Sequence, residues 1–188
     1  MKREPLLEKS TQVWLLNLAR ETIQAHLEGV DLPDPSLVPE DAGALAGCFV
    51  TLKTKAGQLR GCIGTFSESD PLWTCVREMS LRAATVDPRF TPISALELRE
   101  CWVEISALSS REAIAPEAVI PGLHGLWVTS GAARGVLLPQ VATEYQWGRE
   151  EFLSQTCVKA GLTPNAWKSN EVRIEGFTAE VFSERHSG

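Results

Sequence analysis

Residues 57–65 read GQLRGCIGT, and this stretch decides how the rest of the chain is understood. It joins two runs of strand character, Ala46–Thr54 and Leu59–Phe66, and a short loop that contains glycine between two such runs is typical of a β-hairpin. Residues 131–135 read GAARG and repeat the pattern Gly-x-x-Arg-Gly between two further strand-like runs, 126–130 and 135–141. The sequence therefore predicts two hairpins of similar design.

Each predicted hairpin is followed by a helix and then by a strand. After the first hairpin, Asp70 and Pro71 begin a helix over 72–85, and alternating apolar residues indicate a strand over 102–108. After the second, a helix over 150–160 ends at Gly161, and a strand with a bulge near Gly176 covers 172–182. We therefore predict an α+β fold, a mainly antiparallel sheet with helices packed on it, built from two repeated β-β-α-β units over about 46–109 and 124–182. Chance recurrence of glycine-rich hairpins is the alternative to duplication.

Residues typical of helix ends predict two other helices. Ser10 or Thr11 can cap a helix that stops at Gly29. Residues 94–97 read SALE, the spacing of a capping box, and predict a short helical turn.

Composition narrows the class of protein. The chain has 188 residues, 18 Lys and Arg against 24 Asp and Glu, and a formal net charge of −6, which argues against a nucleic-acid-binding protein. No apolar run reaches the roughly 18 residues of a membrane helix, and the N-terminal residues lack the apolar core of a signal peptide. The five cysteines show no Cys-x-x-Cys or other ligand spacing, so we expect reduced thiols, a cytoplasmic location, and neither a metal site nor a cofactor.

Cys62 is the first candidate for chemistry. The period of two in a strand predicts that Leu59 and Ile63 share the core face, with Cys48 in the core of the preceding strand, and that Arg60 and Cys62 share the opposite face whatever the register of the hairpin. Two residues apart along a strand, the Arg60 and Cys62 positions lie about 6–7 Å from each other, close enough for the guanidinium to favour the thiolate form of the cysteine. Gly61 and Gly64 have no side chains and leave room for a ligand or for another backbone. The alternative is a small, packed cysteine, because free cysteine is among the most buried residue types.

Two further positions carry residues capable of acid–base or ionic chemistry. His124 lies between glycines in a loop and is the only mid-chain histidine, so it is the candidate general base; a loop histidine that only hydrogen-bonds to backbone is the alternative. Asp87 and Arg89 lie on a rigid turn, where an ion pair that braces the loop is favoured over a catalytic pair. No motif of serine hydrolases, P-loop proteins or dinucleotide-binding proteins occurs.

Five segments in order make the chain resemble a known family: LRGCIGT at 59–65, DPRF at 87–90, HGL at 124–126, LLPQV at 137–141 and KAGL at 159–162. Together they resemble the AMMECR-type domain, also called AmmeMemoRadiSam system protein A. The resemblance implies one such domain over 1–188, a compact α+β fold with a repeated unit, and a pathway shared with Memo-like and radical-SAM-like proteins. It supplies no substrate and no established catalytic residue.

Two functional hypotheses follow. The first is an enzyme or enzyme component that acts on a small molecule, with Cys62 as the reactive group and His124 moving protons. In this hypothesis Arg60 and Arg89 hold an anionic part of the substrate, and Gly61, Gly64 and Thr65 line the site. The second is a non-catalytic module whose groove and aromatic residues receive a partner protein.

Overall fold

The computed structural model describes residues 6–186 and divides the chain into two compact units. The first unit contains the residues up to Leu108 together with those from Glu180 onward, and the second contains Ser109–Ala179. Each unit has its own hydrophobic core and its own four-stranded sheet. All the pairings described between strands of these sheets are antiparallel, so the predicted α+β fold with antiparallel sheets is confirmed.

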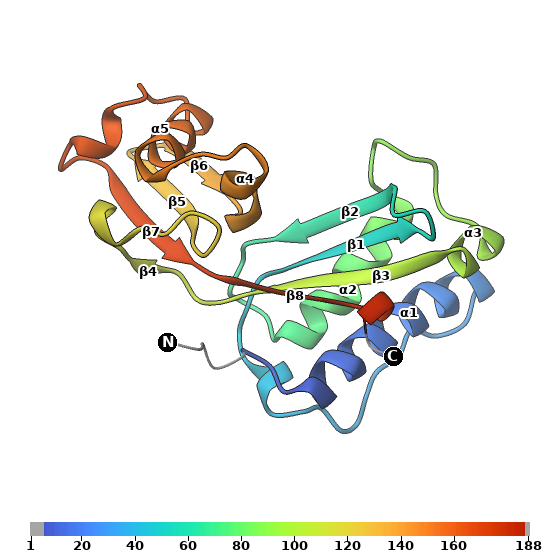
Figure 1. The fold of residues 1–188 in the computed structure, drawn as a ribbon. Coiled ribbons are helices and arrows are strands. Elements are labelled where there is room, and N and C mark those ends of the chain that lie inside the picture. The colour runs from blue at the N-terminus through green and yellow to red at the C-terminus, as the bar shows by residue number, and fades with distance from the viewer. Residues whose placement is uncertain (1–5, 187–188) are drawn as a thin grey trace. The chain divides into compact units, whose positions relative to one another are not determined.

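The first unit is a sheet in the strand order β2-β1-β3-β8 with helices against one face. Figure 1 shows α1 and α2 on the same side of this sheet. In chain order the elements are α1 (Lys9–Glu28), the 3-10 turn η1 (Asp41–Gly43), β1 (Cys48–Thr54), β2 (Leu59–Thr65), α2 (Leu72–Thr85), α3 (Ala95–Arg99), β3 (Cys101–Leu108), β8 (Ala179–Ser183) and the 3-10 turn η4 (Glu184–His186).

Most helix ends follow from local sequence. The start of α1 is an exception: the helix begins at Lys9 after Glu8, so the predicted caps Ser10 and Thr11 lie inside it. α1 stops where Gly29 adopts a left-handed φ of 69°, and its N–H bonds back to the carbonyl of His26. α3 begins with the predicted capping box, in which Ser94 accepts from the N–H of Glu97 and the Glu97 side chain accepts from the N–H of Ser94. Pro71 directly precedes α2 and supplies its fixed φ to the helix start.

Alternate residues of the central strands form the first core. Cys48, Val50 and Leu52 of β1 are fully buried, as are Val103 and Ile105 of β3. Ile63 packs against this core but is only partly buried. The prediction that it faces the core is therefore confirmed, and the prediction that it is buried is wrong. The reason is that β2 is an edge strand with a neighbour on one side only.

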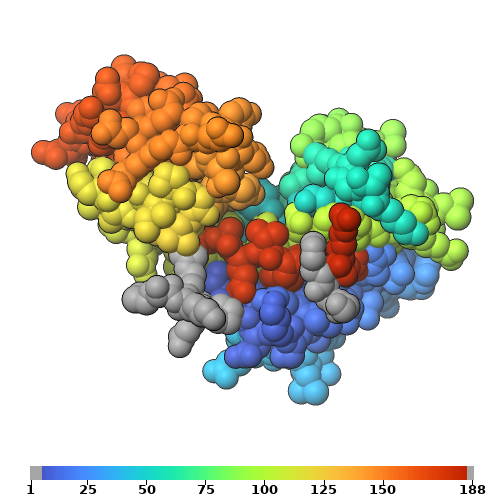
Figure 2. Space-filling view, in the orientation of Figure 1, coloured from blue at the N-terminus to red at the C-terminus, as the bar shows by residue number. Residues whose placement is uncertain are grey.

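The two ends of the first unit are held together along α1 and β8. The N–H of Leu7 and the amide of Gln12 both donate to the carboxylate of Glu180, and Arg20 forms an ion pair of 2.6 Å with Glu184. Figure 2 shows the corresponding surface, with the blue α1 segment beside the red C-terminal segment. The C-terminal strand therefore completes a unit that the N-terminal helix begins.

The second unit has the strand order β4-β7-β5-β6, and α5 packs against β5 and β6. Its core contains Phe152, Leu153 and Cys157 of α5, which are fully buried against Leu126 and Val128 of β5. In chain order the elements are β4 (Glu112–Ala113), η2 (Pro116–Ala118), β5 (Gly125–Ser130), β6 (Ala133–Leu137), α4 (Pro139–Glu144), α5 (Arg149–Lys159), η3 (Ala166–Lys168) and β7 (Arg173–Phe177).

Two strand predictions in the second half are corrected. The run 135–141 is not one strand, because β6 ends at Leu137 and Pro139 occupies the first turn of α4. The run 172–182 is two strands in different sheets, β7 and β8, with Thr178 between them. Gly176 itself pairs regularly with Leu126, so the apolar phase shift there marks the passage between sheets and not a bulge.

The two units share the order hairpin, helix and strand. In both sheets the hairpin's first strand lies between its second strand and the strand that follows the helix. In both, a glycine of the second hairpin strand lies where the helix comes closest: a Cβ on Gly61 would lie 2.2 Å from the carbonyl oxygen of Ala83, and one on Gly135 would lie 2.6 Å from that of Thr156. A common origin of the two halves stays a prediction, and superposition of 46–109 on 124–182 tests it.

Candidate functional site

The face of the first sheet that points away from α1 and α2 is called the open face here. In β1 and β3 it carries the residues that alternate with the buried core positions. Strand pairing places Cys62, Thr51 and Glu104 opposite one another in one row across β2, β1 and β3. Directly opposed side chains in an antiparallel sheet are close neighbours, so a thiol, a hydroxyl and a carboxylate lie side by side.

Cys62 differs from the other four cysteines in its exposure. It is half-buried, whereas the others are buried. The hydroxyl of Thr51 donates a hydrogen bond of 3.1 Å to the Cys62 sulfur, which fixes the direction of the thiol on the open face. Both features leave the sulfur placed for contact with a molecule outside the sheet.

The backbone of Cys62 is held by the turn that contains Asp87 and Arg89. The Cys62 N–H donates to the Asp87 carboxylate at 2.8 Å, and the Arg89 guanidinium donates to the Cys62 carbonyl at 3.2 Å. Asp87 and Arg89 also form an ion pair of 2.6 Å, as the bracing interpretation predicts. These bonds occupy the outer edge of β2, which would otherwise be free to pair with another chain.

The charge on Asp87 is fixed by this arrangement. Its side chain is only 2% exposed, and the Arg89 guanidinium, hydrogen-bonded to the carboxylate, holds the pKa of Asp87 well below its usual range. The N–H groups of Cys62 and Arg89 lower this pKa further, against the opposing effect of burial. A charged carboxylate therefore anchors the strand at the candidate residue.

Arg60 does not lie beside Cys62 in the way that strict alternation predicts. The register between β1 and β2 shifts after Leu52, which pairs with Gly61 while Lys53 pairs with Leu59, so Arg60 is the extra residue of a β-bulge. Its guanidinium donates to the Glu97 carboxylate and to the Thr91 carbonyl, each at 3.0 Å. The bulge breaks the period of two, and the expected Arg60–Cys62 pair is corrected accordingly.

The glycines beside Cys62 admit protein atoms. α2 fills the space next to Gly61, and the ring of Phe49 covers Gly64, whose Cβ would lie 2.3 Å from two atoms of that ring. The Thr65 hydroxyl accepts from the N–H of Ser67 at 3.0 Å and shapes the end of the strand. As substrate contacts, these three residues stay predictions.

The open face also contains three residues that the sequence did not predict as part of a site: Lys53, Trp102 and Glu104. Lys53 forms an ion pair of 2.8 Å with Glu104, and its ammonium also lies 5.1 Å from the centre of the Trp102 ring. The alternation of 102–108 places Trp102 and Glu104 away from the core, so the signal was present in the sequence. The pairing of β3 with β1 could not be predicted from the sequence, and it is this pairing that brings Trp102 and Glu104 close to Cys62.

His124 belongs to the second unit and Cys62 to the first. The Nδ1 atom of His124 accepts a hydrogen bond of 3.1 Å from the N–H of Ile120, so this ring nitrogen carries no proton in that geometry. The ring is thereby oriented by its own loop. Its role as a general base stays a prediction.

The remaining cysteines lie in the cores. The Cys48 and Cys75 sulfurs are 3.2 Å apart and hydrogen-bonded. This hydrogen bond, together with burial, raises the pKa of Cys48. The same hydrogen bond lowers the pKa of Cys75, against the opposing effect of burial. Burial raises the pKa values of Cys101 and Cys157. Among the described residues, no group of three or more His, Cys, Asp or Glu side chains is arranged to hold a metal ion.

Comparison with known proteins shows which family the chain belongs to. The AMMECR1 family model matches residues 16–182. The chain belongs to the AMMECR1 family. A family relative from Methanothermobacter thermautotrophicus is 42% identical over 194 residues, covering 98% of this chain and 99% of its own. Another from Methanocaldococcus jannaschii is 39% identical, covering 95% and 91%.

The family resemblance extends to a solved structure. The crystal structure of an uncharacterised protein from Pyrococcus horikoshii superposes with a TM-score of 0.82 at 35% identity and covers 96% of this chain and 94% of that one. The AMMECR1 match spans residues of both units. No helix within residues 6–186 has the length and apolar character needed to cross a membrane.

Proposed function

We propose that this protein is an enzyme or enzyme component that acts on a small molecule at the open face, with the Cys62 thiol as its reactive group. The observation that carries the proposal is that Cys62 alone among the five cysteines is half-exposed, in a row with a hydroxyl and a carboxylate. A thiol is a strong nucleophile when it can reach its target, and access is what the buried cysteines lack.

The second unit offers a comparison for this position. The residue that follows the helix-contacting glycine is Cys62 in the first unit and Val136 in the second. Val136 pairs with Trp127 in a regular hairpin without a thiol. A strand at the corresponding place in the strand order therefore forms with an aliphatic residue there, which supports a chemical reason for the cysteine.

The other candidate residues take distinct roles in the proposal. Arg89 keeps a half-exposed side chain beside Cys62 and is the group that binds an anionic part of the substrate. Arg60, whose side chain is 12% exposed and bonded to Glu97, is a positioning residue for the loop that follows α2. Glu104 is the proton-transfer group that the first unit supplies, and His124 is the candidate from the second unit.

A metabolite comparison tests the proposal. In a host that lacks the protein, we expect the wild type and Cys101→Ser to restore the normal metabolite profile and Cys62→Ser to leave one compound accumulated. Cys101 is the matched control because it lies in the same sheet but is buried against the helices. Both variants are first checked for cooperative unfolding. Full restoration by Cys62→Ser would show that the thiol is not the reactive group.

The same profiles separate the two proton-transfer candidates. If Glu104 acts, Glu104→Gln should reproduce the accumulated compound while His124→Gln restores the profile; the reverse result would assign the role to His124. Restoration by both variants would exclude both residues from proton transfer.

We further propose that the protein acts in one pathway with Memo-like and radical-SAM-like proteins. The support is the resemblance of its ordered motifs to the AmmeMemoRadiSam system. Hosts that lack the Memo-like or the radical-SAM-like protein should accumulate or lose compounds connected by single reaction steps to the one affected here. Unrelated metabolite changes in the three hosts would contradict a shared pathway.

A non-catalytic interaction module is the second candidate, and the same face favours it. Phe49 and Trp102 are partly exposed there, and Val181 is 53% exposed on β8, next to the buried Phe182. If partner binding is the function, Trp102→Ala should abolish a protein complex while Cys62→Ser leaves both the complex and the metabolite profile unchanged.

A further inference from the structure

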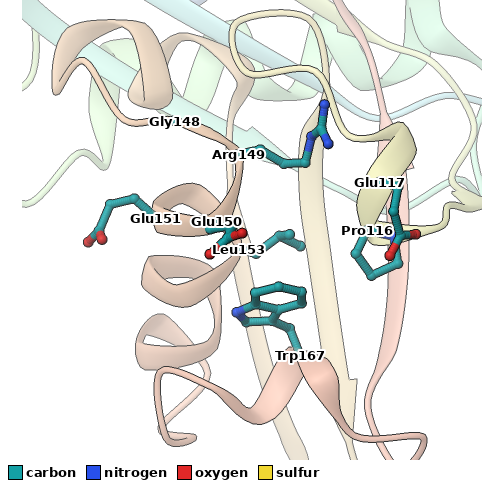
Figure 3. Close-up of a pocket in the computed structure, with 8 residues that line it drawn as sticks. All are labelled: Pro116, Glu117, Gly148, Arg149, Glu150, Glu151, Leu153 and Trp167. Atoms are coloured by element: carbon teal, nitrogen blue, oxygen red, sulfur yellow. The ribbon is translucent and has the colours of Figure 1, made fainter.

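The second unit contains a cavity of about 400 Å³ that is separate from the residues of the proposed Cys62 site. It lies between the first turns of α5 and the 3-10 turn η2. In Figure 3 Leu153 and Trp167 lie across from Pro116 and Glu117, and the Arg149 side chain runs away from Trp167. The lining residues that present surface for binding are Pro116, Glu117, Arg149, Glu150 and Trp167, and the buried Leu153 forms the floor behind them.

The wall of the cavity is an aromatic ring that is held in place. The indole N–H of Trp167 donates to the Ser154 hydroxyl at 3.2 Å, which fixes the ring against α5. Trp167 also lines a second hollow of about 460 Å³, to which Lys168 contributes. The Lys168 ammonium lies 5.0 Å from the centre of the Trp167 ring. The ring therefore already interacts with one cation, and an indole face is the most favourable of the aromatic surfaces for this contact.

Two glutamate carboxylates give the lining of the first cavity its negative charge. Glu117 and Glu150 line it, and within residues 6–186 neither takes part in an ion pair. Arg149 is the one cationic lining residue, and its Nε donates to the Val119 carbonyl at 2.9 Å. The carboxylate of Glu151 accepts from Gln155 and points away from Trp167 (Figure 3). Two carboxylates thus face an apolar and aromatic surface.

We propose that this cavity binds a small organic cation, an ammonium or guanidinium group on a short apolar chain, as a free molecule. The apolar chain packs on Pro116, and the cationic head lies over Trp167 between Glu117 and Glu150. An anion would meet two carboxylates there, and a neutral ligand would gain nothing from them. The inference does not depend on the function proposed for Cys62.

A matched series of four-carbon probes tests the chemistry: butylammonium, butylguanidinium, butanol and butyrate. The readout is the NMR signal of the Trp167 indole N–H in the intact protein, assigned by its loss in Trp167→Phe. We expect both cations to shift this signal in a saturable way, and butanol and butyrate to leave it in place at equal concentration. Higher salt should weaken the binding of both cations.

Variants test whether the named carboxylates are responsible. Glu117→Gln with Glu150→Gln should weaken the binding of butylammonium by about threefold or more, the scale expected when two exposed carboxylates near a cation are removed. Glu144→Gln is the matched control, because Glu144 is an exposed glutamate of the same unit that does not line the cavity. It should leave the dissociation constant unchanged.

Four outcomes would overturn the proposal. The first is an equal response to butanol, which would make the cavity merely apolar, and the second is no response to any probe. The third is equal cation binding by the double variant, which would mean that neither glutamate contributes to binding and would leave Glu150 only its place in the first turn of α5. The fourth is clearly tighter binding of a capped Gly-Arg-Gly peptide than of butylguanidinium. The last result would assign the cavity to a protein side chain and not to a free molecule.

Discussion

Replacing Gly61 by alanine should destabilise the first unit strongly, although it adds a single methyl group. The new Cβ would lie 2.2 Å from the carbonyl oxygen of Ala83 and 3.2 Å from its carbonyl carbon. Both atoms belong to the backbone of α2, so no side-chain rotation relieves the contact and the helix must move by an ångström or more. We expect a loss of about 3 kcal/mol in the free energy of unfolding, the upper end of the usual range for overpacking.

Gly43→Ala is the control for the effect of the methyl group alone. No atom lies within 4 Å of its added Cβ, and its φ is not left-handed, so we expect a change within about 0.5 kcal/mol. Equilibrium unfolding in urea, followed by far-UV circular dichroism, measures both variants. If Gly61→Ala is as stable as Gly43→Ala, then α2 does not approach β2 as described, and the placement of Cys62 on the face opposite α2 loses its support.

Three further predictions concern the residues around this packing. Gly135→Ala should destabilise the second unit as Gly61→Ala does the first, and hydrogen exchange of the β5 amides would show it; unchanged protection would argue against a shared helix–glycine contact. Asp87→Asn should cost about 1–3 kcal/mol near pH 7 and flatten the acid limb of the stability curve. The pKa of Asp87 is lower in the folded protein than its ordinary value near 4, so its contribution is present above about pH 4 and is lost as the pH falls further; an acid limb as steep in Asp87→Asn as in the wild type would contradict this. Arg60→Ala should lower stability by removing the bonds to Glu97 and Thr91, yet leave the alkylation rate of folded Cys62 unchanged; a clearly slower rate would restore the direct Arg60–Cys62 pairing.

Local signals in the sequence predicted most elements of the fold. The helix over 72–85 was delimited by Pro71 and by its apolar period, and α3 by its capping box. The two glycines of each Gly-x-x-Arg-Gly segment also have separate uses: Gly57 and Gly131 adopt positive φ in the hairpin loops, while Gly61 and Gly135 admit the helices. The capping box, the proline and the positive-φ glycines depend on neighbouring residues, which a sequence displays directly, whereas the helices that contact Gly61 and Gly135 come from elsewhere in the chain.

The errors came from features that depend on distant partners. The bulge at Arg60 is defined by the register of β2 against β1, so alternation within β2 alone paired Arg60 with Cys62, whereas its bonds go to Glu97 and Thr91. The residues 172–182 looked like one strand because only Thr178 separates β7 from β8, and only the two sheets show where the chain changes partner. For the same reason the row of Cys62, Thr51 and Glu104 was not predicted, since it joins three strands.

Thiol labelling of the folded protein tests the central claim, an accessible Cys62 on the open face, most directly. The native protein is treated with a limiting amount of an alkylating reagent near neutral pH, and mass spectrometry ranks the five cysteines. Cys62 should react first, at least about tenfold faster than Cys48, Cys75, Cys101 and Cys157, because those thiols are buried and react only when the fold opens. Cys75 is the sharpest comparison, since its pKa is lowered and only its burial protects it. If Cys75 or another buried cysteine is labelled before Cys62, the sulfur of Cys62 is not accessible and cannot be the reactive group of this protein.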